Sequence, residues 1–188
     1  MKLEHSFEIA APIDTVWAAL IDVEFVAPCL PGADVSGRDD DGSYRGTFTV
    51  KLGPTTAIYN GVLRIEDADA TTHTATLHAR GTDKRGQGGA TATIVNRVST
   101  TDGGTLVDAT TDLTITGRLA RFGRGGMIED VSNRMLRDFA TCLQAKLTQP
   151  ADQTGSAPAT ARPVRGMSLF FSVLWERLRR LFSGRGRR

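Results

Sequence analysis

Six strand-like segments in succession, followed by one long helix-like segment, constrain this fold more than any other feature of the sequence. The six segments cover residues 33–38, 44–52, 55–66, 72–82, 89–99 and 105–116. Short polar turns rich in Asp and Gly separate several of them, as in Asp39-Asp40-Asp41-Gly42. Strands joined by such short turns pair with their sequence neighbours. The sequence therefore predicts an antiparallel meander.

A further strand and two short helices are expected before the meander. Apolar and polar residues alternate over 2–10, which indicates a half-buried strand. Pro12 then begins a helix whose buried side consists of Val16, Trp17 and Leu20. A second helical segment, 23–27, ends before Pro28.

Alternation within the strands also indicates which side chains face inward. Several inward positions carry small residues: Ala75, Ala79, Ala109 and Thr111. A sheet with such small residues cannot fill the space beneath it alone. Segment 125–147, whose apolar residues recur every three or four positions, is expected to cover that space. Alternation in 55–66 and 89–99 is ambiguous, so their inward residues are not assigned.

These elements together predict an α+β domain with a helix-grip architecture. A curved antiparallel sheet would wrap around the long C-terminal helix and leave an internal hydrophobic cavity. We expect this domain to cover residues 1–147. Residues 148–164 contain three prolines among Gln, Ser, Thr and Ala, a composition typical of a flexible linker. Residues 165–188 form a separate basic segment.

The basic end of the chain is typical of a membrane-surface helix. Residues 162–188 carry eight arginines and one acid, a net charge of +7, whereas the whole chain is +2 and residues 1–161 therefore sum to −5. A helix over 167–182 would be apolar on one face and basic on the other, and at about 24 Å it is too short to span a bilayer. The predicted membrane-binding residues are Phe170, Phe171, Leu174, Trp175, Leu178, Arg179, Arg180, Leu181 and Phe182.

Other partners for this helix remain open. Basic amphipathic helices also bind grooves on partner proteins, and some bind nucleic acid. The apolar face favours lipid, and we expect no nucleic-acid partner. The chain opens directly into a strand-like pattern without an apolar signal region. We therefore expect a cytoplasmic protein that lies peripherally on the inner face of the cell membrane.

The sequence contains no pattern that nominates a catalytic or metal site. His5, His73 and His78 lack the spacing of metal ligands, and no Ser/His/Asp set can be identified. The two cysteines, Cys29 and Cys142, both sit among apolar neighbours in sequence. We interpret them as reduced core residues of a cytosolic protein.

Several motifs resemble a known family. Residues 7–17 (FEIAAPIDTVW) are similar to the start of START-like (Bet v 1-like, SRPBCC) ligand-binding domains. Residues 29–33 (CLPGA), 44–46, 50–54 and 117–120 together resemble the CoxG family of carbon monoxide dehydrogenase proteins. The resemblance covers about residues 1–147. It implies a non-catalytic accessory protein of a molybdenum-containing carbon monoxide dehydrogenase or a related hydroxylase, with a cavity for lipids, polyketides, sterols or quinones.

Candidate ligand-binding residues are the apolar side chains expected between the sheet and the long helix. An ordinary filled core is the alternative for each of them. They are Phe7, Ile9, Leu30, Phe48, Val50, Leu77, Ala109, Leu113, Ile115, Leu119, Phe122, Met127, Ile128, Val131, Met135 and Phe139. Arg118, Arg121 and Arg124 are expected at the cavity mouth, where they would meet lipid headgroups or a polar quinone head; the alternative is a solvated basic loop.

Three functions are compatible with these features. The first is a membrane-recruited carrier of a quinone, such as menaquinone, between the membrane and the dehydrogenase. The second is a membrane anchor or assembly factor without a ligand. The third is a small-molecule enzyme of the same fold, although no residue motivates a particular reaction.

Overall fold

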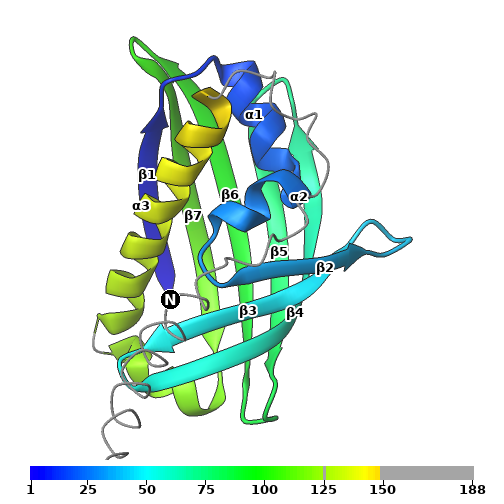
Figure 1. Ribbon diagram of the computed structural model, residues 1–188, viewed down its shortest axis with the longest axis vertical. Helices are drawn as coiled ribbons and strands as arrows, with labels where there is room; N and C mark the ends of the chain where they lie inside the picture. Colours follow the sequence, from blue (N-terminus) through cyan, green and yellow to red (C-terminus); the bar gives the residue numbers. More distant parts are fainter. Residues whose placement is uncertain (125, 149–188) are drawn as a thin grey trace, which may run out of the picture. The chain divides into compact units, whose positions relative to one another are not determined.

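The computed structural model describes residues 1–124 and 126–148, apart from the side chains of residues 118, 123 and 124. The predicted linker and amphipathic tail lie outside these residues. The elements follow one another along the chain as in Figure 1. They are β1 (Lys2–Ile9), α1 (Ile13–Ile21), α2 (Val23–Val26), η1 (Ala27–Cys29), β2 (Ala33–Arg38), β3 (Tyr44–Leu52), β4 (Thr55–Asp69), β5 (Thr74–Asp83), β6 (Gly89–Thr101), β7 (Gly104–Ile115), η2 (Gly117–Arg124) and α3 (Met127–Thr148).

The seven strands form one antiparallel sheet in the order β1-β7-β6-β5-β4-β3-β2. Strands β2 to β7 pair with their sequence neighbours, so the predicted meander is confirmed. The N-terminal strand β1 pairs with the last strand, β7, over its whole length. This pairing places β1 at the edge of the sheet, where α3 packs against it: the Gln144 side chain of α3 accepts a 2.7 Å hydrogen bond from the Ala10 backbone N–H just after β1.

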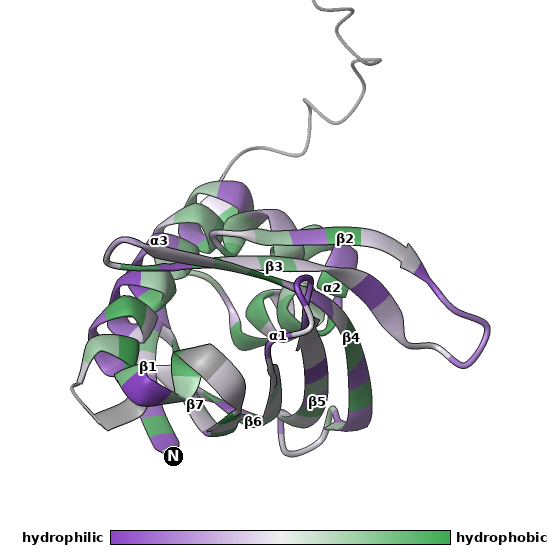
Figure 2. Ribbon diagram, turned by 90° about the horizontal axis from the view of Figure 1, so that it is seen from below, coloured by the Kyte–Doolittle hydropathy of each residue, from purple (hydrophilic) through white to green (hydrophobic). Residues whose placement is uncertain are grey.

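The sheet curves around α3, and the short helices α1 and α2 lie on the same concave side (Figure 2). Helix α3 places Ile128 and Leu143 in buried positions. Its Phe139 ring packs edge-on against Phe7 of β1, with ring centroids 5.9 Å apart. These contacts explain the three- and four-residue spacing of apolar residues in this segment. The predicted α+β helix-grip architecture is confirmed.

The register of the strands shows which residues of β4 and β6, the two strands with ambiguous alternation, face inward. In β4, Leu63 pairs with buried Tyr44 on one side and with Ala79 on the other. The concave face therefore receives Ala57, Tyr59, Gly61, Leu63 and Ile65 from β4. In β6, Ile94 pairs with buried Leu77, so the concave residues are Ala90, Ala92, Ile94, Asn96 and Val98.

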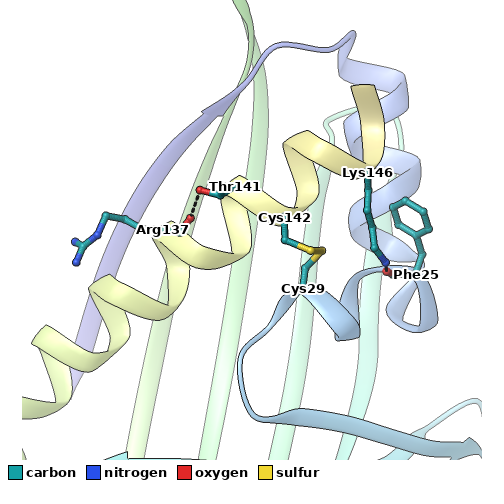
Figure 3. Close-up of a disulfide and its surroundings, with 6 residues drawn as sticks. All are labelled: Phe25, Cys29, Arg137, Thr141, Cys142 and Lys146. Atoms are coloured by element: carbon teal, nitrogen blue, oxygen red, sulfur yellow. Dashed lines mark hydrogen bonds between the residues drawn. A yellow bond between two sulfur atoms is a disulfide. The ribbon is translucent and has the colours of Figure 1, made fainter. Parts of the chain in front are cut away.

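A disulfide joins Cys29 at the end of η1 to Cys142 in α3 (Figure 3). The prediction of two reduced cysteines was therefore wrong. The residues are 113 positions apart in sequence, but the fold brings their Cα atoms to 5.3 Å. Close by, the Lys146 ammonium donates a 2.7 Å hydrogen bond to the Phe25 carbonyl oxygen and lies 4.6 Å from the Phe25 ring centroid. Both interactions fasten the C-terminal part of α3 to the α2–η1 segment.

A hydrogen bond from Thr105, at the start of β7, joins the sheet to the loop after β1 and can be tested by substitution. Its side chain is fully buried, and its hydroxyl donates a 2.7 Å hydrogen bond to the Ala11 carbonyl oxygen. Thr105→Val would leave that oxygen without this donor, so we expect the free energy of unfolding to fall by about 1–3 kcal/mol in urea denaturation. Thr110→Val on the outer face should change it by less than about 0.5 kcal/mol. Equal effects of the two substitutions would contradict this role.

Candidate functional site: the concave face of the sheet

Two packed clusters of buried side chains lie on the concave side of the sheet. The first cluster gathers side chains of β1, α1 and the C-terminal part of α3, including Ile9, Trp17, Leu20 and Leu143. The second gathers side chains at the η2 end, including Leu3, Leu52, Tyr59, Leu119 and Ile128. The two clusters therefore hold opposite ends of α3 against the sheet.

Small residues occupy the concave face between these clusters. Ala79 of β5 and Ala92 of β6 pair with each other, and neither belongs to a cluster. Both are only half-buried, as is Met135 of α3. Part of each of these three residues therefore remains accessible to solvent. The sequence-based expectation of small inward residues at Ala79 and Ala109 is confirmed by the register.

The predicted ligand-binding residues divide between the two clusters. Ile9 and Leu77 are buried in the first cluster, and Phe7 and Phe139 pack against it. Leu119 and Ile128 are buried in the second, with Phe48, Val50, Leu113, Ile115, Phe122 and Val131 packed against it. Ala109, Leu30 and Met135 belong to neither cluster, although Ala109 is buried. Met127 at the start of α3 is 37% exposed.

The η2 segment lies where a cavity mouth was predicted. Leu119 is buried, whereas Arg121 is exposed and holds its guanidinium 4.9 Å from the Phe122 ring centroid. Arg118 and Arg124 belong to the same 3-10 helix, but their side chains are not among those described. The mouth assignment of the three arginines stays a prediction.

Polar groups on the concave side were missed by the sequence reasoning. His5 of β1 lies 3.1 Å from the Ser132 hydroxyl of α3, measured from its Nε2 atom. Asn96 faces inward from β6, between Ala75 and Ala109 in register. The alternation over 2–10 did place His5 inward, but nothing in the sequence indicated Ser132 as its partner. The inner face thus offers polar contacts beside apolar surface.

Two hollows lie along the outer junction of β1 and α3 and were not predicted. One, of about 500 Å³, is lined by Glu4, His5, Ser6, Phe7, Asn133, Leu136, Arg137, Ala140 and Thr141. The other, of about 350 Å³, is lined by Lys2, Leu3, Glu4, His5 and Glu129. Within it, the hydrogen bond and charge of Glu4 raise the pKa of Lys2, and the bond from Lys2 lowers the pKa of Glu4. Both groups stay charged, which makes this rim polar.

The described residues hold no group of three or more His, Cys, Asp or Glu side chains placed to bind a metal ion. Among the described helices, none is long and apolar enough to cross a membrane. The concave face consists of two packed clusters, with the half-buried small residues Ala79 and Ala92 paired between them.

Comparison with known proteins assigns the chain to a family. Residues 6–148 match the sequence profile that describes CoxG, a subunit of carbon monoxide dehydrogenase. The chain belongs to the CoxG family. The match covers the whole sheet except the first residues of β1 and extends to the end of α3. The resemblance that the sequence motifs indicated is thereby confirmed. No curated protein sequence matches the chain.

Solved structures confirm the fold of this CoxG-family chain. A conserved protein from Geobacillus kaustophilus is 19% identical with a TM-score of 0.67, covering 78% of this chain and 95% of that one. The Zhui aromatase/cyclase from Streptomyces sp. R1128 is 18% identical with a TM-score of 0.57, covering 84% and 99%. A START superfamily protein from Mycobacterium smegmatis is 13% identical with a TM-score of 0.50, covering 78% and 96%. At these identities the likeness shows the START-like fold alone.

Proposed function

We propose that this CoxG-family protein carries a hydrophobic molecule, a respiratory quinone such as menaquinone, between the cell membrane and a molybdenum-containing carbon monoxide dehydrogenase. It would act as an accessory protein without catalysis of its own. The observation that carries the proposal is the pair of small, half-buried residues Ala79 and Ala92 on the concave face, which leaves room for an apolar ligand between the two packed clusters. Family membership supports the dehydrogenase as the partner.

A long apolar ligand needs such an interior. Burial is worth about 0.8 kcal/mol for each CH₂-sized group, so exposing an isoprenoid tail to water during transfer would be prohibitive. A cavity between the sheet and α3 would replace lipid as the solvent, which makes uptake from a bilayer nearly neutral in free energy. Met135 suits a flexible chain because methionine adapts its shape. Inward polar groups such as Asn96 and the His5–Ser132 pair would meet the polar head.

The predicted tail supports recruitment to the membrane. Its arginines and its apolar face would place the protein on the inner, anionic surface of the cytoplasmic membrane. A helix bound at the interface leaves the folded domain free to exchange ligand with both the bilayer and the enzyme. The binding is expected to be reversible, because no membrane span is needed for it.

Filling the under-packed zone tests the carrier proposal. Ala92→Phe would add a ring at an inward, half-buried position, and we expect it to reduce the co-purified apolar ligand at least tenfold. The measurement is mass spectrometry of organic extracts from full-length protein. Thr91→Phe is the matched control, because the neighbouring residue points to the opposite face of the sheet. It should retain the ligand.

The same variants separate the carrier from a ligand-free anchor. If Ala92→Phe folds normally and electron transfer from the dehydrogenase to membrane quinone continues unchanged, the protein acts as an anchor or assembly factor. Wild-type protein that repeatedly yields no apolar molecule would also contradict the carrier proposal. Circular dichroism and thermal unfolding establish that each variant is folded.

A further inference from the structure

One end of the domain gathers segments from several parts of the chain. The β3–β4 turn, the β5–β6 turn and the start of α3 lie at the lower end of Figure 1. Backbone hydrogen bonds join this end: the Lys84 N–H donates to the Ile58 carbonyl, and the Leu113 N–H donates to the Met1 carbonyl. Leu52, Leu119 and Ile128 pack in one cluster beneath it. We call this surface the basic end.

The basic end is more positive than the acidic body to which it belongs. Its positive groups are the Met1 amino group, Lys51, Lys84, Arg85 and Arg121. The carboxylates nearby are Asp83, Asp112, Glu129, Asp130 and Glu4, of which Glu4 binds Lys2 and Asp83 accepts a hydrogen bond from the Arg85 N–H. Lys51, Lys84, Arg85 and Arg121 are all exposed.

The opposite end carries the reverse charge. The end of β4, the β6–β7 turn and the helices α1 and α2 hold Asp67, Asp69, Asp102, Asp14 and Glu24, with Lys146 of α3 beside α2. A hydrogen bond from the Thr71 backbone N–H lowers the pKa of Asp69 and keeps it ionised. The domain therefore has a charge dipole along its length, although residues 1–161 are acidic as a whole. Such a dipole turns the basic end toward an anionic surface.

Exposed apolar side chains gather at the same end. Four large apolar residues are exposed within the described part of the chain: Met1, Ile58, Val62 and Met127. Met1, Ile58 and Met127 all lie at the basic end, at 46%, 37% and 37% exposure. Basic side chains interspersed with exposed apolar ones are the composition of a surface that enters the headgroup region of a bilayer.

We propose that the basic end is a second, tail-independent contact with anionic phospholipid, which directs η2 and the start of α3 toward the bilayer. This inference rests on the membrane location proposed above and adds an orientation to it. The exposed apolar residues favour lipid over an acidic protein surface, because charge alone would fit both. A molecule leaving the bilayer would then face the predicted cavity mouth directly.

Charge reversal at the β5–β6 turn tests this contact in the full-length chain. Lys84→Glu with Arg85→Glu removes two basic residues, each worth about fivefold in binding, so we expect the Kd for vesicles of phosphatidylglycerol and phosphatidylcholine to rise at least about 25-fold. Arg64→Glu with Arg97→Glu changes the net charge equally on the exposed outer face of the sheet. This control should raise the Kd less than about threefold, because its charges lie away from the proposed contact.

Hydrogen exchange on the same vesicles reports the orientation. In the wild-type chain, peptides covering 51–55, 84–88 and 117–121 should be protected by vesicles, and the Lys84/Arg85 variant should lose that protection. Equal Kd changes in both double variants, or no protection of these peptides, would overturn the inference while leaving ligand extraction to decide the carrier proposal. Protection by the dehydrogenase but not by vesicles would overturn it in favour of an acidic protein partner.

Discussion

Replacing Leu174 and Trp175 together by serine is expected to weaken binding of the full-length protein to anionic vesicles at least about a hundredfold. Both residues lie on the predicted apolar face of the tail helix. Each large apolar side chain gains up to about 1.5–3 kcal/mol on full burial, so two together are worth about 3 kcal/mol or more, and 1.4 kcal/mol corresponds to a factor of ten. Vesicle flotation or co-sedimentation measures the change without relying on tryptophan fluorescence.

Leu169→Ser with Val173→Ser is the matched control for the tail. These residues are also apolar but fall off the apolar face of the predicted helix. Their replacement should weaken binding less than about tenfold, and raising the salt concentration should weaken binding of every variant because the arginines contribute electrostatically. If both double variants bind vesicles as the wild type does, the tail is not the membrane anchor. A groove on a partner protein would then be its binding site.

Removing the disulfide is expected to produce the largest change in stability. The bond closes a loop of 113 residues, and chain entropy predicts a stabilisation near 4–5 kcal/mol for a loop of about this length. We expect Cys29→Ala with Cys142→Ala to lower the free energy of unfolding by about 3–5 kcal/mol in urea. This is a large fraction of the roughly 5–15 kcal/mol that stabilises a typical domain.

Reductant provides the control for the disulfide. Dithiothreitol should destabilise the wild-type protein by a similar amount and leave the double alanine variant unchanged. If reductant does not change the urea midpoint of the wild-type protein, the disulfide does not stabilise the domain as proposed. Disulfides are uncommon in reducing cytoplasm. Alkylating the thiols at the moment of cell lysis therefore measures whether the bond exists at the proposed location.

Local sequence patterns were sufficient to predict the strands and the long helix of this fold. Turn residues such as Asp39 to Gly42 separated the strands, because tight turns favour Asp and Gly whatever surrounds them. The spacing of Ile128, Val131, Met135 and Phe139 indicated a helix with one apolar face, and α3 has those residues. The small inward residues of β5 and β7 were also found, since alternation along a strand follows from its two-residue period.

These local patterns could not predict contacts between residues that are far apart in the sequence. Tyr59 and Asn96 were not assigned to the concave face, because mixed residues in β4 and β6 obscure the alternation and only pairing with β3 and β5 resolves it. The His5–Ser132 contact and the hollows beside β1 depend on where α3 lies against the sheet edge. The sequence also contained no sign of which charged turns would share an end of the domain.

The sequence by itself determined the order of strands and helices along the chain and the family, since both follow from local patterns and motifs. Only the tertiary structure decided that Cys29 bonds to Cys142, that Ala79 and Ala92 lie between two packed clusters, and that basic and acidic turns separate to opposite ends. These are relations between residues tens of positions apart. Chain folding and strand register, rather than local preference, set the distances between them.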